Sequence, residues 1–115
     1  MNKRIMNLIL ASIFISPLSH AVTFSGTCSD NGGTIHTNIR LNDVTANTAQ
    51  QSPGVIIRSF EGREWRIANE FGNHDIYTEQ VRVADMARLF DLRVNICEGK
   101  SDFSPRRVWA LEITK

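Results

Sequence analysis

The chain of 115 residues is poor in the residue types from which small catalytic and metal sites are built. It has two cysteines and three histidines, and none of them forms a CxxC, HxxxH or HExxH pair, which excludes the common zinc and redox motifs. A GxSxG nucleophile motif and a glycine-rich phosphate loop are also missing. We therefore predict that the protein has no catalytic residue, no metal and no cofactor.

The chain also has no large excess of charge of either sign, because it has thirteen basic and twelve acidic residues. Binding to nucleic acid without sequence preference needs a basic surface, so this balance argues against a nucleic-acid partner. After the first 21 residues, no apolar stretch of the sequence approaches membrane-spanning length.

The first 21 residues have the three parts of a secretory signal peptide. Lys3 and Arg4 give a positive start, residues 6–15 are an apolar stretch too short to span a bilayer, and Ser19-His20-Ala21 fits a cleavage site. We expect cleavage after Ala21, with an uncleaved anchor as the alternative. Residues 22–115 then form one secreted domain with a net charge of −1, because two basic residues leave with the leader.

Both cysteines that the chain does have, Cys28 and Cys97, lie in this domain. An even pair in an exported protein usually forms a disulfide, although a metal or redox site is the competing interpretation. A bridge that closes a loop of about 70 residues stabilises a fold by roughly 4 kcal/mol in the chain-entropy model. A domain of this size buries only about 60–65% of its unfolded surface, so such a contribution matters.

The hydrophobic pattern predicts five strands and one helix. The strands are expected at residues 34–41, 54–60, 64–68, 92–96 and 109–113, and the polar residues 42–53 are expected to form a loop. The helix is expected over residues 78–91, with Thr78 as its N-cap. Its predicted core stripe consists of Val83, Met86, Ala87, Leu89 and Phe90, and its predicted polar side consists of Arg82, Asp85 and Arg88.

A single helix between the third and fourth of five strands is the element order of the OB-fold, a Greek-key barrel. A generic α+β sandwich with the helix on one face of the sheet fits the same order. The pattern alone does not choose between these two folds.

The histidines and tryptophans of the mature chain favour structural roles. His36 is predicted on the outward face of a strand and His74 in a loop, so both are expected to be solvated. Trp65 and Trp109 are in phase with apolar strand neighbours and are predicted to pack in the core rather than to stack on a ligand.

The polar loops are better candidates for a function. Residues 30–33 and 45–52 are rich in small hydroxyl and amide side chains, which can bond sugar hydroxyls without the desolvation cost of a full charge. Loop carboxylates such as Asp30 and Asp75 could instead form the acid pair of a small secreted glycoside hydrolase, but their spacing gives this alternative no support.

Several stretches of the mature chain carry a family resemblance. The most specific is Ser104-Pro105 with residues 108–113, and the others are Gly54-Val55 and residues 62–67, 78–82 and 93–97, together with the distance from Cys28 to Trp65. In these features the chain resembles the receptor-binding B subunit of the type II heat-labile enterotoxins. Residues 22–53 match mainly through Cys28, Leu41 and their spacing.

The resemblance implies an OB-fold protomer: mainly β, a five-stranded Greek-key barrel with the helix between strands 3 and 4, and a Cys28–Cys97 disulfide. Five such protomers would form a homopentameric ring, with Arg82, Asp85 and Arg88 of the helix lining a central pore. The implied partners are a catalytic A subunit, usually an ADP-ribosyltransferase, whose tail threads the pore, and host glycolipid or glycoprotein glycans such as a ganglioside or other sialylated glycan.

The resemblance also places the glycan site. The family's ganglioside contacts include three threonines, and their positions fall on Asn31, Gly32 and Ser52, none of which is threonine in this chain. We therefore expect a binding face with a changed glycan preference. The flanking residues are secondary candidates: Asp30, Thr34 and Gln51.

A competing hypothesis has the same fold but no toxic partner subunit. It is a secreted or periplasmic OB-fold binding protein, such as an orphan lectin or an inhibitor. The two hypotheses differ in assembly, because a toxin B subunit needs a stable pentamer with an open pore, whereas the binding protein could be a monomer.

Overall fold

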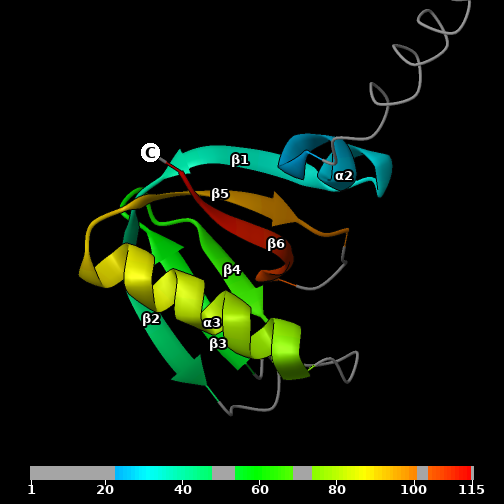
Figure 1. Cartoon of the computed structure of the whole chain (residues 1–115). Coiled ribbons are helices and arrows are strands. Elements are labelled where there is room, and N and C mark those ends of the chain that lie inside the picture. Colours follow the sequence, from blue (N-terminus) through cyan, green and yellow to red (C-terminus); the bar gives the residue numbers. More distant parts are fainter. Residues whose placement is uncertain (1–22, 48–53, 69–73, 101–103, 115) are drawn as a thin grey trace, which may run out of the picture.

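A computed structural model of the chain describes residues 23–47, 54–68, 74–100 and 104–114. The described part is mainly β, with two helices and six strands (Figure 1). In chain order the elements are α2 (Phe24–Asp30), β1 (Thr34–Ile39), β2 (Leu41–Asn47), β3 (Gly54–Ser59), β4 (Glu64–Ile67), α3 (His74–Leu89), β5 (Arg93–Glu98) and β6 (Arg106–Thr114). In the same residues, no helix combines the length and apolar character needed to cross a membrane.

The strands form one curved sheet in the order β1-β5-β6-β4-β3-β2. Neighbouring strands are antiparallel, except that β4 and β6 pair in parallel where Trp65 faces Arg106 and Arg66 faces Arg107. The two end strands of this order, β1 and β2, are consecutive in the chain and are separated only by Arg40. The sheet therefore curls so that its ends meet at this residue.

The prediction of a closed five-stranded barrel is wrong, because the sheet has six strands and an open order. The predicted strand over residues 34–41 breaks near Asn38, which has a positive φ of 57° and lies where the register between β1 and β5 shifts. The backbone N–H of Asn38 donates to Oδ1 of Asn95 at 3.1 Å. A side-chain oxygen therefore takes the place of a backbone carbonyl of the neighbouring strand at this position.

The predicted loop over residues 42–53 is wrong in its first half. Residues 41–47 form β2, which runs antiparallel to β3. The strand is polar because it lies at the end of the sheet, and its Asp43 Oδ2 accepts a hydrogen bond from Arg58 Nη1 at 3.2 Å. Alternation of apolar residues therefore could not reveal it.

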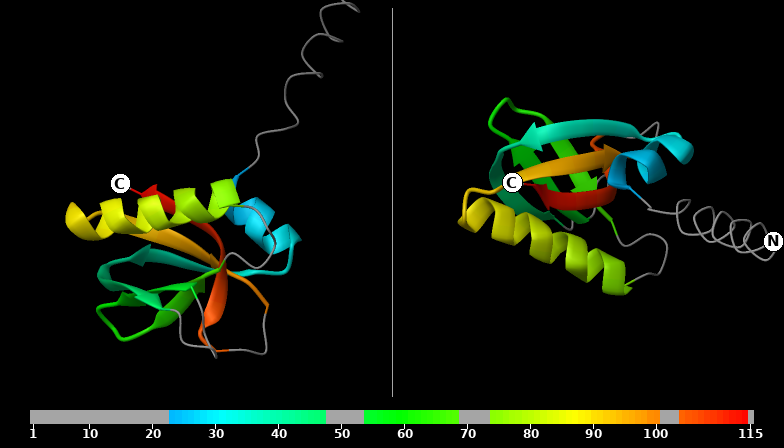
Figure 2. Two further views of the ribbon diagram at one scale, coloured as in Figure 1. Left: turned by 90° about the horizontal axis from the view of Figure 1, so that it is seen from below. Right: turned by 45° about the horizontal axis from the view of Figure 1, so that its top comes forward.

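The core lies between α3 and the concave side of the sheet (Figures 1 and 2). Its fully buried strand side chains come from β3, β4 and β5: Ile57, Trp65, Ile67, Val94 and Ile96. From α3, Ala84 and Ala87 are buried in this cluster, and Tyr77 and Val81 are partly buried against it. The small alanines let the helix approach the sheet closely.

The predicted bounds and core stripe of the helix need correction. Helix α3 begins at His74, so Thr78 lies inside the helix rather than at its N-cap, and His74 is helical rather than in a loop. Met86, Leu89 and Phe90 were predicted to be buried but are 41%, 69% and 68% exposed. The buried stripe is turned toward Ala84, because contacts with the sheet rather than the apolar pattern alone set the rotation of the helix.

Helix α2 was not predicted. Thr23 caps its N-terminus by accepting a hydrogen bond from the N–H of Gly26 at 2.9 Å, and Cys28 is its one buried residue among those described. Figure 2 shows α3 along one side of the sheet and α2 beside the start of β1. A seven-residue helix with so short an apolar face depends on its cysteine for attachment.

Candidate functional site

A disulfide fixes one end of the molecule. Cys28 of α2 is bonded to Cys97 of β5, with the two Cα atoms 5.8 Å apart, which confirms the predicted pairing. Gly33 packs against this bridge, since a Cβ at position 33 would lie 2.6 Å from Sγ of Cys97 and 2.7 Å from Sγ of Cys28. The disulfide therefore anchors the turn between α2 and β1 to β5.

Four of the predicted glycan residues lie on this turn. Asp30 is the exposed last residue of α2, Asn31 is its exposed C-cap, Gly32 follows with a φ of 79°, and Thr34 is the exposed first residue of β1. The structure thus brings Asp30, Asn31, Gly32 and Thr34 together at one end of the protein. The remaining two, Gln51 and Ser52, lie outside the described residues.

The side chain of Asn31 is held in one orientation. Its Nδ2 donates to the backbone carbonyl of Thr27 at 2.8 Å, and its backbone N–H donates to the same oxygen at 3.3 Å. The amide oxygen Oδ1 is therefore turned away from the helix. A fixed amide oxygen is a suitable acceptor for a sugar hydroxyl.

An open pocket of about 600 Å³ lies beside the disulfide. Its lining combines aromatic side chains with small polar ones: Thr23, Phe24, Thr27, Cys28, Asn31, Cys97, Trp109 and Ala110. Aromatic side chains can pack against the apolar face of a sugar ring, and hydroxyl and amide groups can orient the sugar by bonding its hydroxyls. The lining of this pocket therefore suits a monosaccharide.

The two tryptophans have different environments, although both were predicted in the core. Trp65 is fully buried, which confirms its prediction, and its Nε1 donates to Oε1 of Glu98 at 3.0 Å. Trp109 is only partly buried and lines the pocket, so its prediction is wrong. Its carbonyl oxygen accepts a hydrogen bond from Nε2 of Gln80 at 3.2 Å, which ties this part of β6 to α3.

Of the residues that line the pocket, the sequence identified only Asn31 as a ligand contact, and it missed both aromatic ones, Phe24 and Trp109. Phe24 carried no signal because α2 itself was not predicted. One signal for Trp109 was present: Gly99 lies so close to its indole ring that any side chain at position 99 would collide with the ring. A glycine that follows a strand is consistent with such a close approach, but it does not name the partner.

A polar network surrounds the carboxylate of Glu98, which follows Cys97 in β5. His36 is partly buried and packs with its ring tilted against Trp65, with the ring centroids 5.3 Å apart, so the prediction that it is solvated is wrong. Nη1 of Arg63 donates to Nδ1 of His36 at 2.7 Å, and Nε2 of His36 faces Oε1 of Glu98 at 3.2 Å. If Nδ1 accepts from Arg63, the proton of neutral His36 is on Nε2, which lies near Glu98 without forming a hydrogen bond to it.

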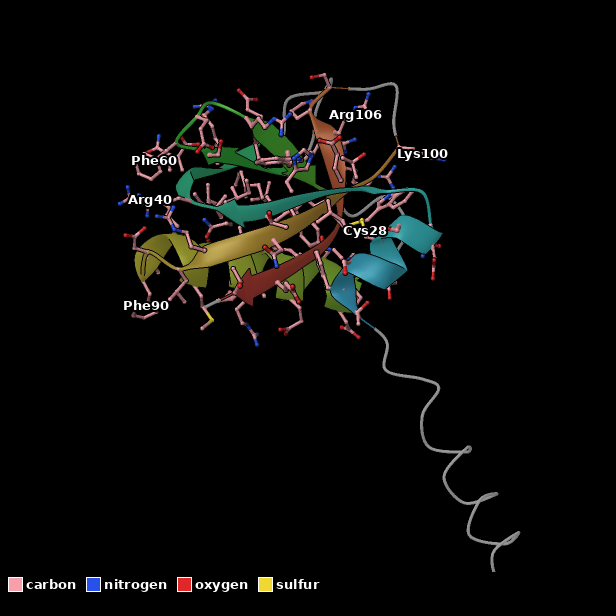
Figure 3. The ribbon with its side chains drawn as sticks, turned by 90° about the horizontal axis from the view of Figure 1, so that it is seen from above. Cys28, Arg40, Phe60, Phe90, Lys100 and Arg106 are labelled. Atoms are coloured by element: carbon pink, nitrogen blue, oxygen red, sulfur yellow. A yellow bond between two sulfur atoms is a disulfide. The ribbon has the colours of Figure 1, made fainter. Side chains whose placement is uncertain are left out.

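The opposite end of the molecule carries Arg40, Phe60 and Phe90, whereas Cys28, Lys100 and Arg106 lie toward the disulfide end (Figure 3). The guanidinium of Arg40 lies 4.2 Å from the centre of the Phe60 ring and pairs with Asp91 at 2.7 Å.

The predicted pore residues, Arg82, Asp85 and Arg88, are all exposed on α3. Arg82 pairs with Glu79 at 3.1 Å, and Arg88 borders a second, smaller hollow near Arg40. Their place relative to a pore is a property of an assembly, so the pore-lining role stays a prediction. Among the described residues, no group of three or more His, Cys, Asp or Glu side chains could hold a metal ion.

Comparison with known proteins agrees with this fold. The family model described as "Type II heat-labile enterotoxin, B subunit (LT-IIB)" matches residues 1–115. No curated protein matches the chain by sequence.

Among solved structures, human heat-labile enterotoxin in complex with a blood group A antigen analog has a TM-score of 0.69 and 16% identity, with 84% of this chain and 100% of that chain covered. The porcine Escherichia coli heat-labile enterotoxin B-pentamer in complex with lacto-N-neohexaose has a TM-score of 0.68 and 16% identity, with the same coverage. The GM1-bound form of the ECX AB5 holotoxin has a TM-score of 0.62 and 15% identity, with 84% and 98% covered. At such identities the likeness shows the B-subunit fold alone.

Proposed function

Because this chain belongs to the family of type II heat-labile enterotoxin B subunits, we propose that it is the receptor-binding subunit of a secreted toxin. In this function it assembles as a homopentamer, binds glycans on the host cell and delivers a catalytic A subunit. The observation that carries the proposal is the family match over residues 1–115, in a chain with the B-subunit fold. The protein acts by binding and not by catalysis.

Two strand edges support assembly into a ring. In the described part of the chain, β2 pairs on one side only, with β3, and β6 pairs with β4 only through Arg106 and Arg107. Apart from the Trp109 carbonyl, which Gln80 of α3 engages, the rest of β6 therefore offers an open edge, and so does β2. Unpaired edges favour association with another chain, and pairing β2 of one protomer with β6 of the next would close both.

The pocket beside the disulfide supports glycan binding. It combines the aromatic residues Phe24 and Trp109 with the fixed amide of Asn31, and it adjoins the turn on which Asp30, Gly32 and Thr34 lie. In a pentamer, five identical sites would act on one membrane. Weak binding at each site then gives strong attachment through avidity.

The exposed polar side of α3 supports the proposed pore. Arg82, Asp85 and Arg88 offer charged groups that a tail of the A subunit could contact in a water-filled channel. The name B subunit implies such a partner, and the ECX relative is described as an AB5 holotoxin. Residues 1–21 are the proposed signal peptide, so that the mature secreted domain is residues 22–115.

The native mass of the purified mature protein tests this proposal. Native mass spectrometry without reductant should give five times the protomer mass, with each chain two hydrogens lighter than its reduced form. A glycan array with the same preparation should then show binding to a defined set of glycans. A monomer that binds a sugar or another ligand would instead favour the orphan binding protein, and a pentamer that binds no glycan would remove receptor binding from the proposal.

A further inference from the structure

The Cys28–Cys97 bridge lies in the wall of the pocket described above. Both cysteines line the pocket, although Cys28 is only 3% exposed and Cys97 only 1%. Gly33 covers part of the bridge, because its backbone lies so close to both sulfur atoms that a Cβ there would collide with them. The open pocket is therefore a path by which a small molecule can approach a bridge that is otherwise buried.

The bridge also joins the two walls of the pocket. One wall belongs to α2 and its caps, and its residues are Thr23, Phe24, Thr27 and Asn31. The other wall belongs to β6, where Ala110 pairs with Cys97 of β5 across the sheet. The sulfur–sulfur bond therefore holds the first wall against the second.

Helix α2 has few other attachments. It has seven residues, and Cys28 is the one among them that is buried. None of these seven residues, all of which the structure describes, belongs to the hydrophobic core between α3 and the sheet. A helix this short is not stable by itself in water. Cleavage of the bridge should therefore release α2 from β6 and leave the core in place.

We propose that the Cys28–Cys97 bridge is a redox switch for the candidate glycan site. In the oxidised protein the pocket is formed and binds its ligand. In the reduced protein α2 separates from β6 and the pocket is lost, while the sheet and the pentamer remain. A ligand in the pocket also blocks the approach to the bridge, so bound glycan and reductant oppose each other. The inference rests on the proposed glycan-binding function and adds a condition that controls it.

The reductant is a small dithiol. One of its thiolates attacks the sulfur of one cysteine, the bond between Cys28 and Cys97 breaks, and the other cysteine leaves as a thiolate and takes up a proton. The second thiol of the reductant then displaces the first cysteine from the mixed disulfide. Both electrons come from the reductant, which ends as a cyclic disulfide, and both cysteines end as thiols.

The first part of the test measures access to the bridge. The mature oxidised protein is treated with dithiothreitol, portions are alkylated with iodoacetamide at intervals, and mass spectrometry counts the modified cysteines. Thr27 is exposed and lines the pocket, so Thr27→Phe places a bulky side chain in the opening and should slow reduction severalfold. Ser25→Phe is the matched control, because Ser25 is exposed on the same helix but is not part of the described pocket lining. Its bridge should be reduced at the wild-type rate.

The second part measures the switch itself. Oxidised and reduced wild type are applied to the same glycan array, and a glycan that binds there is then added to the reduction assay. The reduced protein should lose binding, reoxidation should restore it, and the bound glycan should slow reduction. The double variant Cys28→Ser, Cys97→Ser should behave like the reduced protein with or without reductant. Native mass and circular dichroism establish whether each form remains a folded pentamer.

The outcomes separate the switch from the receptor function. Equal reduction rates in Thr27→Phe and Ser25→Phe overturn the pocket as the path to the bridge. A reduced pentamer that binds the same glycans equally well overturns the switch and leaves glycan binding intact. A reduced protein that unfolds or dissociates also overturns it, because the bridge then holds the whole fold rather than one wall of the pocket. An oxidised pentamer that binds no glycan overturns the receptor function and the switch together.

Discussion

The two ends of this small domain are held together by different interactions. At one end, the Cys28–Cys97 disulfide joins α2 to β5, with Gly33 packed against it. The close contact between Gly99 and the Trp109 indole fixes β6 there as well. At the other, where β1 passes into β2, the exposed Arg40 guanidinium pairs with Asp91 and lies over the Phe60 ring, itself 54% exposed. One end is fixed by a covalent bond and close packing, the other by solvated charges.

The difference shows where a rigid site can be built. An exposed ion pair is screened by water and adds little to stability, whereas a long-range disulfide limits the unfolded chain and packing against backbone admits little movement. Recognition of a sugar requires donors and acceptors in fixed positions. The disulfide end, where Asn31 and the pocket lie, meets this requirement better than the Arg40 end.

The largest effect should follow from removing the disulfide. The double variant Cys28→Ser, Cys97→Ser should lose about 4 kcal/mol of unfolding free energy. The reason is that the bridge joins residues 69 positions apart and so restricts the unfolded chain. Urea denaturation of matched protomer concentrations measures this loss, and wild type treated with a reductant is the control. A loss below about 1 kcal/mol would mean that packing alone holds α2 to the sheet.

The next effect should come from Gly99→Ala. The added methyl group collides with the indole of Trp109, and such overpacking costs about 1–3 kcal/mol. Gly62→Ala, in the turn after Phe60 toward the Arg40 end, is the comparison: it has no atom within 4 Å of a Cβ but a φ of 91°, so only backbone strain of about 1 kcal/mol is expected.

Both variants are assayed by urea denaturation and by binding to the glycans found on the array. Gly99→Ala should weaken binding because it moves a wall of the pocket, and Gly62→Ala should not. Equal binding by the two variants would show that the position of Trp109 is unimportant to the site.

How much of this structure can be predicted from the sequence depends on the range of the deciding interaction. Alternation of apolar residues located β3, β4, β5 and β6 because each has one face in the core. The break near Asn38 was not predictable in this way, because it depends on Asn95, 57 positions later. Helix α2 likewise depends on Cys97.

The candidate site shows the same limit. Asp30, Asn31, Gly32 and Thr34 were named from the resemblance, and they do share one turn. Trp65 and Trp109 have the same local alternation, and only the tertiary fold separates a core residue from a pocket residue.

A smaller effect concerns the polar network around His36. If Arg63 donates to Nδ1 of His36, neutral His36 must carry its proton on Nε2. Long-range ¹H–¹⁵N correlation spectra near neutral pH should show this single tautomer. Arg63→Gln should give a mixture of tautomers at a cost of about 1 kcal/mol or less. A proton on Nδ1 in wild type would rule out the hydrogen bond from Arg63.

The smallest effect should come from the ion pair at the Arg40 end. Hydrogen bonds from Arg40 to the ionised carboxylate lower the pKa of Asp91, so the pair stabilises the fold above the ordinary aspartate pKa and this contribution is lost as the pH falls through the lowered value. Asp91→Asn should therefore be slightly less stable than wild type at neutral pH, and the difference should shrink on acidification. Thermal denaturation across this pH range measures it, with Asp85→Asn, an exposed acid on α3, as the control. A difference that grows in acid would mean that the carboxylate destabilises this end, and the contrast between the two ends would then be larger than the ion-pair geometry indicates.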